Sequence, residues 1–228
     1  MRRHLFRLCV SAAAFVLGLT SAGLWPRESV PRPLPPVVAA PTATAKSGCA
    51  PGESETVDDD TRVEDRYYNY NYGFSVDLPA GMVGFASAPP RPAHGFGINL
   101  VNPKVGWVYS EGFPKSYLYV DASYNSAFLE SLDAAVKTDL RYIAEEGQAV
   151  TVLSRTKTRL GGLRAVRVVA RYVKDGEATV SDALIAFRKD NGEDVVYTIA
   201  LDTPQADYEK HRLVVNEMQK TFCLQPLP

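Results

Sequence analysis

Few side chains in this sequence are placed to do nucleophilic or acid–base chemistry. Cys223 is a candidate nucleophile, because a thiolate forms once a base removes its proton. Its nearest histidine, His211, lies twelve residues earlier, which is about 18 Å along one helix. His94 is a candidate base or metal ligand, but no second histidine or cysteine lies near it. A histidine on the surface is therefore the simpler interpretation of His94.

The short motifs of common catalytic classes are absent from the sequence. It contains no G-x-S-x-G, no H-E-x-x-H and no C-x-x-C, which are signatures of serine hydrolases, zinc peptidases and thiol redox proteins. The run 58–60 consists of three aspartates without the alternating spacing of a calcium loop, so we expect it to be solvated. The sequence predicts no catalytic residue, metal ligand or cofactor. Hydrolase chemistry would require an acid and a base that are distant in the sequence and that the fold brings together.

The most unusual chemical feature is a segregation of charge. The segment 148–174 contains no acidic residue and seven basic residues. Residues two apart share one face of a strand, so most of these basic residues fall into two sets on two expected strands. The two sets are Arg155, Lys157 and Arg159, and then Arg167 and Arg171.

We interpret these five residues as a candidate surface for an anionic partner. That partner would be an unidentified protein or an anionic component of the cell envelope, such as a lipid headgroup or a cell-wall polymer. The alternative is that the acidic segment 53–65, or neighbouring acidic strands, neutralises the basic residues within the molecule. The net charge of the whole chain is −1, which gives no sign of nucleic-acid binding.

The N-terminus has the features of an export signal. Three arginines lie in the first seven residues, and the apolar segment 8–25 follows without a charge. Small residues favour cleavage after Ala22, so we expect residues 1–22 to be a signal peptide and the protein to be periplasmic or extracellular. Eighteen apolar residues are also long enough to span a bilayer. Two alternatives therefore remain. The segment is not cleaved and anchors the protein in the inner membrane, or the protein is exported by the twin-arginine route.

Residues 23–65 form an expected linker, first rich in proline and then acidic. Seven of the sixteen prolines lie between residues 23 and 51, a composition that cannot form a core. After loss of the signal with Cys9, two cysteines remain, Cys49 and Cys223. We expect them to form a disulfide, because exported domains favour bridges and domain termini often lie close together. A catalytic role for Cys223 is the alternative.

The stretch "RYYNYNYGFSVDLP" at 66–79 opens the expected folded domain, residues 66–223. Its even positions from 68 to 78 are aromatic or apolar and its odd positions are mostly polar. This alternation predicts one strand, or two short strands broken at Gly73, with the even positions buried. An exposed stacking platform formed by Tyr67 and Tyr70 is the alternative.

The rest of the domain alternates between strand and helix patterns. Short strands are expected near 82–86 and 96–101, and a longer one at 116–124. An apolar face recurs at Phe128, Leu132, Val136, Leu140 and Ile143.

This periodicity predicts a helix from a cap at Asn125 or Ser126 to Gly147. Glycine turns then divide 149–202 into a four-stranded antiparallel meander. A last helix is expected from Thr203 and Pro204 to Phe222. We predict an α+β fold with an antiparallel sheet of about six to eight strands and two main helices.

The segment "YGFSVDLPAGM", residues 72–82, resembles a motif of the PsbP-like fold family. The order of a helix, a meander with a "VYTIAL" strand and a final helix ending in Phe222 is also similar. Relatives often have Trp where this chain has Met82.

The resemblance implies a PsbP-like sandwich and a module that binds proteins, lipids or assemblies without catalysis. The family includes the extrinsic subunit of photosystem II and a Ran-binding import factor. It shares no catalytic residues that could be transferred to this chain.

Three functions follow from the sequence as hypotheses. The first is an exported, non-catalytic binding or accessory module of the cell envelope. The second is a protective or chaperone-like protein that binds one dedicated effector. The third is a hydrolase with a site assembled by the fold, in which His94 or His211 would take part.

Overall fold

The computed structural model of the protein describes residues 62–86, 94–105, 107, 112–125, 129–189 and 194–225. The contacts of the chain divide it into Met1–Lys46 and Ser47–Pro228, and all described residues belong to the second unit. The predicted signal, Cys49 and nearly all of the predicted linker lie outside the described residues. A first short strand is nevertheless described at Arg62–Val63, just before the predicted boundary of the domain at 66.

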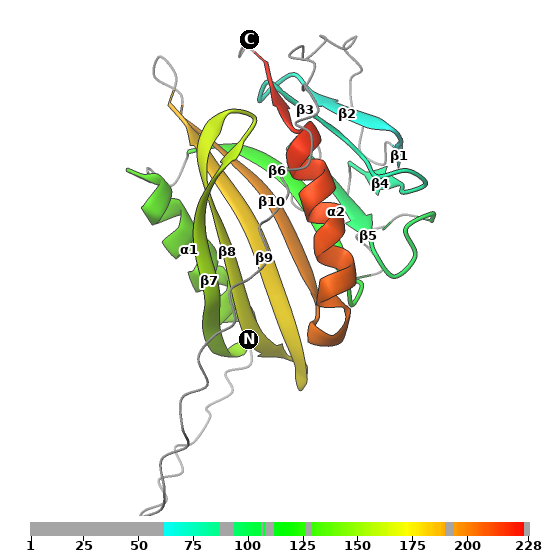
Figure 1. The fold of residues 1–228 in the computed structure, drawn as a ribbon, viewed down its shortest axis with the longest axis vertical. Coiled ribbons are helices and arrows are strands. Elements are labelled where there is room, and N and C mark those ends of the chain that lie inside the picture. Colours follow the sequence, from blue (N-terminus) through cyan, green and yellow to red (C-terminus); the bar gives the residue numbers. More distant parts are fainter. Residues whose placement is uncertain are drawn as a thin grey trace, which may run out of the picture. The chain divides into compact units, whose positions relative to one another are not determined.

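An antiparallel sheet of eight strands forms the centre of the described domain (Figure 1). Three strands at one end are short, and the five others are eight to thirteen residues long. In spatial order the strands are β1 (Arg62–Val63), β4 (Gly84–Phe85), β5 (Gly95–Asn99), β6 (Tyr117–Tyr124), β10 (Val195–Pro204), β9 (Glu177–Arg188), β8 (Leu163–Lys174) and β7 (Gln148–Leu160).

The predicted meander is confirmed as β7 to β10. The turn between β7 and β8 consists of Gly161 and Gly162, both with positive φ, and the turn between β8 and β9 consists of Asp175 and Gly176, also with positive φ. Two-residue turns with positive φ at both positions match the right-handed twist of the strands they join. The third predicted turn, at 190–192, lies outside the described residues.

A second sheet of three strands contains the tyrosine-rich stretch. Its order is β11 (Cys223–Leu224), β3 (Phe74–Asp77) and β2 (Arg66–Asn69). The chain reverses direction between β2 and β3. The predicted burial of the even-numbered residues is therefore observed only after this turn, from Tyr72 to Leu78.

Tyr67, which has an odd number, is buried, whereas Tyr68 and Tyr70 are half-exposed. The prediction of a single apolar face was therefore wrong for β2. A stacking platform at Tyr67 is also wrong, because that ring is only 3% exposed and packs against Phe74 and Phe96.

Helices α1 (Leu132–Glu146) and α2 (Tyr208–Thr221) cover opposite faces of the large sheet (Figure 1). On β9, Leu184 belongs to the core beneath α2, and its neighbour Ile185 belongs to the core beneath α1. Successive residues of a strand point to opposite faces. The central strands are consequently apolar on both sides, and the predicted α+β sandwich with two helices is confirmed.

Both helices begin later than predicted. The cap of α1 is Ser131, whose Oγ accepts a hydrogen bond from the backbone N–H of Ala134 at 3.2 Å. Asn125 instead bonds with the backbone of Leu129. At the other helix, β10 continues through Pro204 and a turn of 3-10 helix precedes Tyr208. Neither helix among the described residues is long and apolar enough to cross a membrane.

Candidate functional site

A cavity of about 420 Å³ lies between α1 and the face of the sheet that α1 covers. Its floor is formed by side chains of β6, β10, β9 and β8, and its roof by α1. The lining combines aromatic rings with four carboxyl groups, which are those of Asp121, Asp139, Glu146 and Asp202. The volume is in the range of small-molecule sites, so this cavity is the candidate functional site.

The floor consists of rows of side chains that the strand register places side by side. Tyr117 on β6 is paired with Asp202 on β10, which is paired with Ser181 on β9. Two rows away, Asp121 on β6 is paired with Thr198 on β10. Paired residues in antiparallel strands point to the same face, so polar side chains from three strands meet there.

The roof is one face of α1. Ala135, Thr138, Asp139, Tyr142 and Glu146 line the cavity, and their spacing of three or four residues places them along one side of the helix. The neighbouring apolar stripe of α1 packs on β8 and β9. This stripe fixes the helix and thereby holds the polar residues over the floor.

Asp202 is a buried carboxyl group supported by two tyrosines. The hydroxyl of Tyr172 donates a hydrogen bond to its Oδ1 at 2.9 Å, and Tyr117 also bonds to this carboxyl. Burial raises the pKa of Asp202, while the two tyrosine hydroxyls and the nearby Lys174 act against that increase. The carboxyl is thus held in place on the floor.

Asp139 faces this group from the helix. Its Oδ2 is buried and has no hydrogen-bond partner among the described residues. Burial, followed by the negative charge of Asp202, raises the pKa of Asp139 to about 7. Near neutral pH the carboxyl of Asp139 is therefore divided between its neutral and charged forms.

Aromatic side chains surround the cavity where it meets the surface. Phe113, Tyr124 and Tyr142 line it and are 51%, 40% and 55% exposed, respectively. The ammonium of Lys174 lies 5.6 Å from the ring centroid of Phe113 and 6.0 Å from that of Tyr117. These rings thus already contact one cation of the protein itself.

Two kinds of chemistry suit this arrangement. An acid with a pKa near 7 can exchange protons at neutral pH, and desolvated carboxyl groups beside aromatic rings can bind a cation. The described residues contain no group of three or more His, Cys, Asp or Glu side chains that could hold a metal ion.

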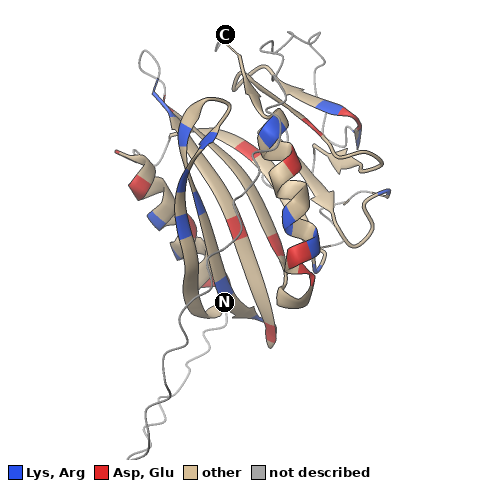
Figure 2. Ribbon diagram, viewed as in Figure 1, with Lys and Arg blue, Asp and Glu red and all other residues tan. Residues whose placement is uncertain are grey.

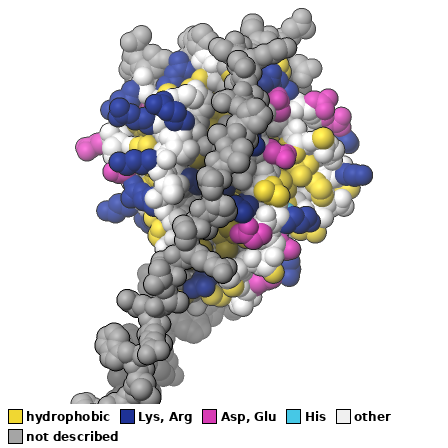
Figure 3. Space-filling model, viewed as in Figure 1, with side chains coloured by type: hydrophobic (Ala, Val, Ile, Leu, Met, Phe, Trp, Pro, Cys, Tyr) yellow, Lys and Arg dark blue, Asp and Glu magenta, His cyan; other side chains and the backbone are white. Residues whose placement is uncertain are grey.

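The basic residues singled out in the sequence are divided between two faces. Arg155, Lys157 and Arg159 are exposed, and the β8 partners of the first two belong to the core beneath α1. Arg155 donates to Asp133 on α1 at 2.5 Å, so one of the three is neutralised within the molecule. Arg167 and Arg171 have the other parity on β8, so they point to the face of α2. Figure 2 marks several Lys and Arg positions on the ribbon of α1 and β7, and Figure 3 shows Lys and Arg side chains gathered on the same side. Contact with an anionic partner stays a prediction.

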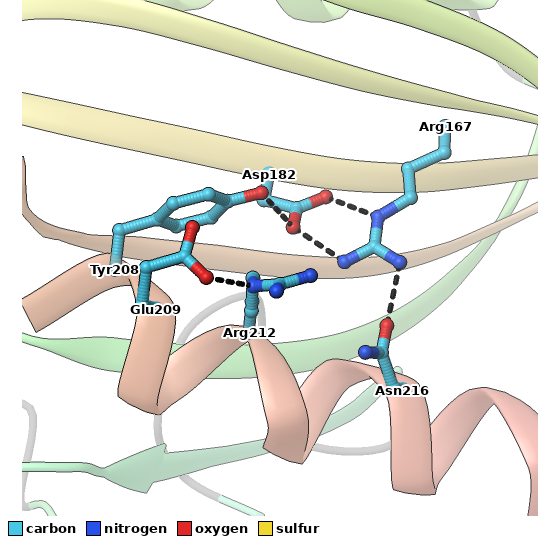
Figure 4. Close-up of polar contacts among 6 residues, drawn as sticks. All are labelled: Arg167, Asp182, Tyr208, Glu209, Arg212 and Asn216. Carbon is cyan, nitrogen blue, oxygen red and sulfur yellow. Dashed lines mark hydrogen bonds and ion pairs between the residues drawn. The ribbon is translucent and has the colours of Figure 1, made fainter. Parts of the chain in front are cut away.

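Arg167 is engaged inside the molecule (Figure 4). Its Nε and Nη2 donate to the two carboxyl oxygens of Asp182 at 2.7 and 2.6 Å, and its Nη1 donates to Asn216 on α2 at 2.6 Å. The hydroxyl of Tyr208, also on α2, donates to Asp182 at 2.9 Å. The hydrogen bond and charge of Asp182 raise the pKa of Arg167. This network connects α2 to β8 and β9.

Neither of the two described histidines lines the cavity itself, although His94 lies beside Asp121, which does. The Nδ1 of His211 lies 2.8 Å from the hydroxyl of buried Thr203, and burial lowers the pKa of His211. His94 is partly exposed, and its Nδ1 lies 2.9 Å from the carbonyl oxygen of Ala122 and 4.0 Å from Asp121. Cys223 begins β11. Because Cys49 lies outside the described residues, the disulfide stays a prediction.

Sequence reasoning missed Asp139 and Asp202. Asp202 comes at the end of an apolar strand pattern, and Asp139 lies on the polar side of a predicted helix. Each local pattern, taken alone, is typical of a carboxyl group exposed to water. One signal was present in the strand 117–124, which has aromatic or apolar residues on one face and Tyr117, Tyr119 and Asp121 on the other. Aromatic residues on both faces of a strand indicate that both faces are covered.

Replacing Arg167 with Met should reduce the free energy of unfolding by about 3–5 kcal/mol, because the charge of Asp182 would be left buried and unpaired. Denaturant unfolding measures this loss. Arg171→Met is the matched control, because Arg171 is exposed on the same strand and face and its loss should cost under about 0.5 kcal/mol. Equal losses in the two variants would contradict a special role for the ion pair.

The titration of Asp139 should make stability depend on pH. Its pKa is raised from 3.8 to about 7 on folding, so its neutral form is favoured in the folded chain. The resulting stability is fully present below pH 3.8 and is lost as pH rises through 7.

At pH 8, Asp139→Asn should therefore have a free energy of unfolding at least about 1 kcal/mol higher than that of the wild type, measured by denaturant unfolding. Near pH 4 the two proteins should be similarly stable. Exposed Glu145→Gln on the same helix is the control and should keep the wild-type pH profile. A wild-type profile in Asp139→Asn as well would show that Asp139 does not titrate near 7.

No family model matches the chain, and no curated protein matches it. Among solved structures, it is similar to LpqN of Mycobacterium tuberculosis, described as involved in cell envelope biogenesis, at 12% identity, with 75% of this chain and 95% of that chain covered and a TM-score of 0.48. It is also similar to cyanobacterial PsbP from Synechocystis, at 12% identity, 76% and 98% coverage and a TM-score of 0.48.

The Ran-binding protein Mog1p of Saccharomyces cerevisiae is another similar structure. Its identity is 10%, the coverage is 72% of this chain and 95% of that chain, and the TM-score is 0.44. The resemblance seen in the sequence named the same two kinds of protein, PsbP and a Ran-binding factor. Both similarities concern the arrangement of strands and helices, at low sequence identity.

Proposed function

We propose that the protein is a non-catalytic binding module that acts after export, and that the cavity beneath α1 is its ligand site. The observation that supports this proposal is the composition of the cavity: an exposed aromatic rim above a floor with buried carboxyl groups. Aromatic walls with a few polar groups that converge from several elements are typical of small-molecule sites.

The lining favours binding over catalysis. Among the described residues that line the cavity there is no histidine, cysteine or lysine. Among the described lining residues, the hydroxyls of Ser123 and Ser181 therefore have no imidazole or amine that could act as a base. The carboxyl of Asp202 accepts hydrogen bonds from two tyrosines, which is a holding role.

A hydrolase is the second candidate, and one observation favours it. Asp139, with a pKa of about 7, faces Asp202 across the cavity, and the charge of Asp202 contributes to that raised pKa. General acids and bases need values near the working pH. In that case Asp139→Asn would abolish turnover of a substrate, whereas a binding module has no turnover to lose.

Export and partners belong to the same proposal. The expected signal at 1–22 and the expected Cys49–Cys223 bridge support a periplasmic or extracellular location. An anionic envelope component at Arg155, Lys157 and Arg159 would then be a second contact, on exposed residues outside the cavity lining. A dedicated protein effector is the alternative partner.

Small aromatic molecules should enter the cavity. We would test phenyl compounds that end in an ammonium, a hydroxyl or a carboxylate group. At least one of them should bind and shift the amide NMR signals of β6, β10 and α1. Thr198→Phe should abolish these shifts, because Thr198 lines the floor and the larger ring would fill the space.

Thr156→Phe is the matched control, because Thr156 is exposed on β7 and outside the lining. It should leave the shifts unchanged. If no compound shifts these signals, or if Thr198→Phe binds as the wild type does, the cavity is not the ligand site.

Export should produce a chain that begins at Gly23. Mass spectrometry of the protein recovered from the envelope fraction of its host would measure the N-terminus. Recovery from the cytoplasm with residues 1–22 intact would count against export. An intact N-terminus in the membrane fraction would instead support the anchor.

A further inference from the structure

We infer that the ligand of the cavity is a protonated amine attached to an apolar body, that is, an alkylammonium or arylalkylammonium compound. This inference rests on the proposed function, because it specifies the chemistry of the same site. The ammonium would lie between Asp139 of α1 and Asp202 of β10, and the apolar body would lie against the aromatic rim.

The charge of the lining supports a cation. Four carboxyl groups line the cavity, and the described lining contains no lysine, arginine or histidine. Lys174 lies outside the lining and forms an ion pair with Glu146 at 3.2 Å, and its charge also acts on Asp202. No basic side chain of the described lining accompanies Asp139 and Asp202, and neighbouring carboxyl groups in a partly desolvated space attract a counter-ion.

The hydrogen bonds of the two carboxyl groups indicate which cation fits. Asp202 accepts from the hydroxyls of Tyr117 and Tyr172, but Oδ2 of Asp139 is buried and has no partner among the described residues. A buried acceptor without a donor is costly. A primary ammonium has three N–H donors and a positive charge, whereas a quaternary ammonium has the charge without a donor.

The aromatic residues supply the remaining contacts. The ammonium of Lys174 already lies near the rings of Phe113 and Tyr117, so this end of the cavity accommodates a positive charge beside aromatic faces. At the rim, the exposed rings of Tyr124 and Tyr142 offer apolar surface to the body of a ligand. A molecule with one ammonium and one apolar group matches both parts.

Binding of such a cation should depend on pH. An ammonium beside Asp139 replaces the proton that this carboxyl holds near neutral pH, so binding releases a proton. Tyr119 on β6 and Asp202 on β10 interact with Asp139 directly. The other charged or titratable groups at this cavity are Tyr117 and Asp121 on β6, Tyr172 and Lys174 on β8, Tyr142 and Glu146 on α1, and His94 beside Asp121. The pKa of Asp139 is about 7. The affinity for an ammonium should therefore increase by up to about tenfold for each unit by which the pH rises toward 7, and it should level off above pH 7.

Three probes with the same aromatic body separate charge from shape. They are 2-phenylethylammonium, 2-phenylethanol and 3-phenylpropionate, titrated by NMR into the protein recovered from the host envelope. At pH 8 the ammonium should bind at least about tenfold more tightly than the alcohol, and the carboxylate should bind least. The trimethylated form of the ammonium should bind more weakly than the primary form, because it cannot donate to Asp139.

Asp139→Asn provides the decisive comparison. It should weaken binding of the ammonium by about tenfold or more at pH 8 and remove the pH dependence, while the affinity for the alcohol changes by less than about threefold. Glu145→Gln is the control, because it removes the same charge from an exposed position on the same helix, and it should leave all three affinities unchanged.

The outcomes distinguish this inference from the proposed function. If the three probes bind equally well and Thr198→Phe blocks them, the cavity is a ligand site but the cation inference is wrong. If Asp139→Asn leaves ammonium binding and its pH dependence intact, the inference is wrong as well. If no probe binds in the cavity, both the inference and the proposed function fail.

Discussion

The arrangement of the domain depends on a buried ion pair between two neighbouring strands. Arg167 and Asp182 form two parallel hydrogen bonds, and the side chain of Asp182 is completely buried. Removing both charges from water is costly unless their remaining donors and acceptors are paired. Helix α2 supplies these partners through Tyr208 and Asn216. The position of α2 is therefore fixed by polar contacts as well as by the apolar residues beneath it.

With α2 and the small sheet held on one face, the two faces of the large sheet differ in character. The face of α2 is filled by the main apolar cluster, which includes Phe74, Leu184 and Ile199. The face of α1 has a smaller apolar cluster over β8 and β9, and beside it the cavity extends toward β6 and β10. One face thus supplies most of the core, and the other offers space lined by carboxyl groups and aromatic rings.

Local patterns were sufficient to predict much of this fold. The meander followed from glycine turns and alternating strands, and the apolar period of 132–143 identified α1. Predictions failed where a decision depended on distant residues. The turn between Asn69 and Phe74 changed which tyrosines are buried, and pairing with β9 extended β10 through Pro204. The candidate site could not be predicted for the same reason, since Asp139 and Asp202 lie 63 residues apart in the sequence and only the fold brings them to one cavity.

The exposed strand β7 has a further consequence for how copies of the protein behave in solution. It is the last strand of the sheet, thirteen residues long, and among the described strands it pairs only with β8. Such an edge presents unpaired backbone groups that can add another strand and start aggregation. Lys157 and Arg159 lie two residues apart on it, beside Arg155, which pairs with Asp133 on α1. Two copies paired through this edge would bring the charges of Lys157 and Arg159 close to those of the second copy. The same cations that we considered for a partner therefore also protect the sheet from uncontrolled growth.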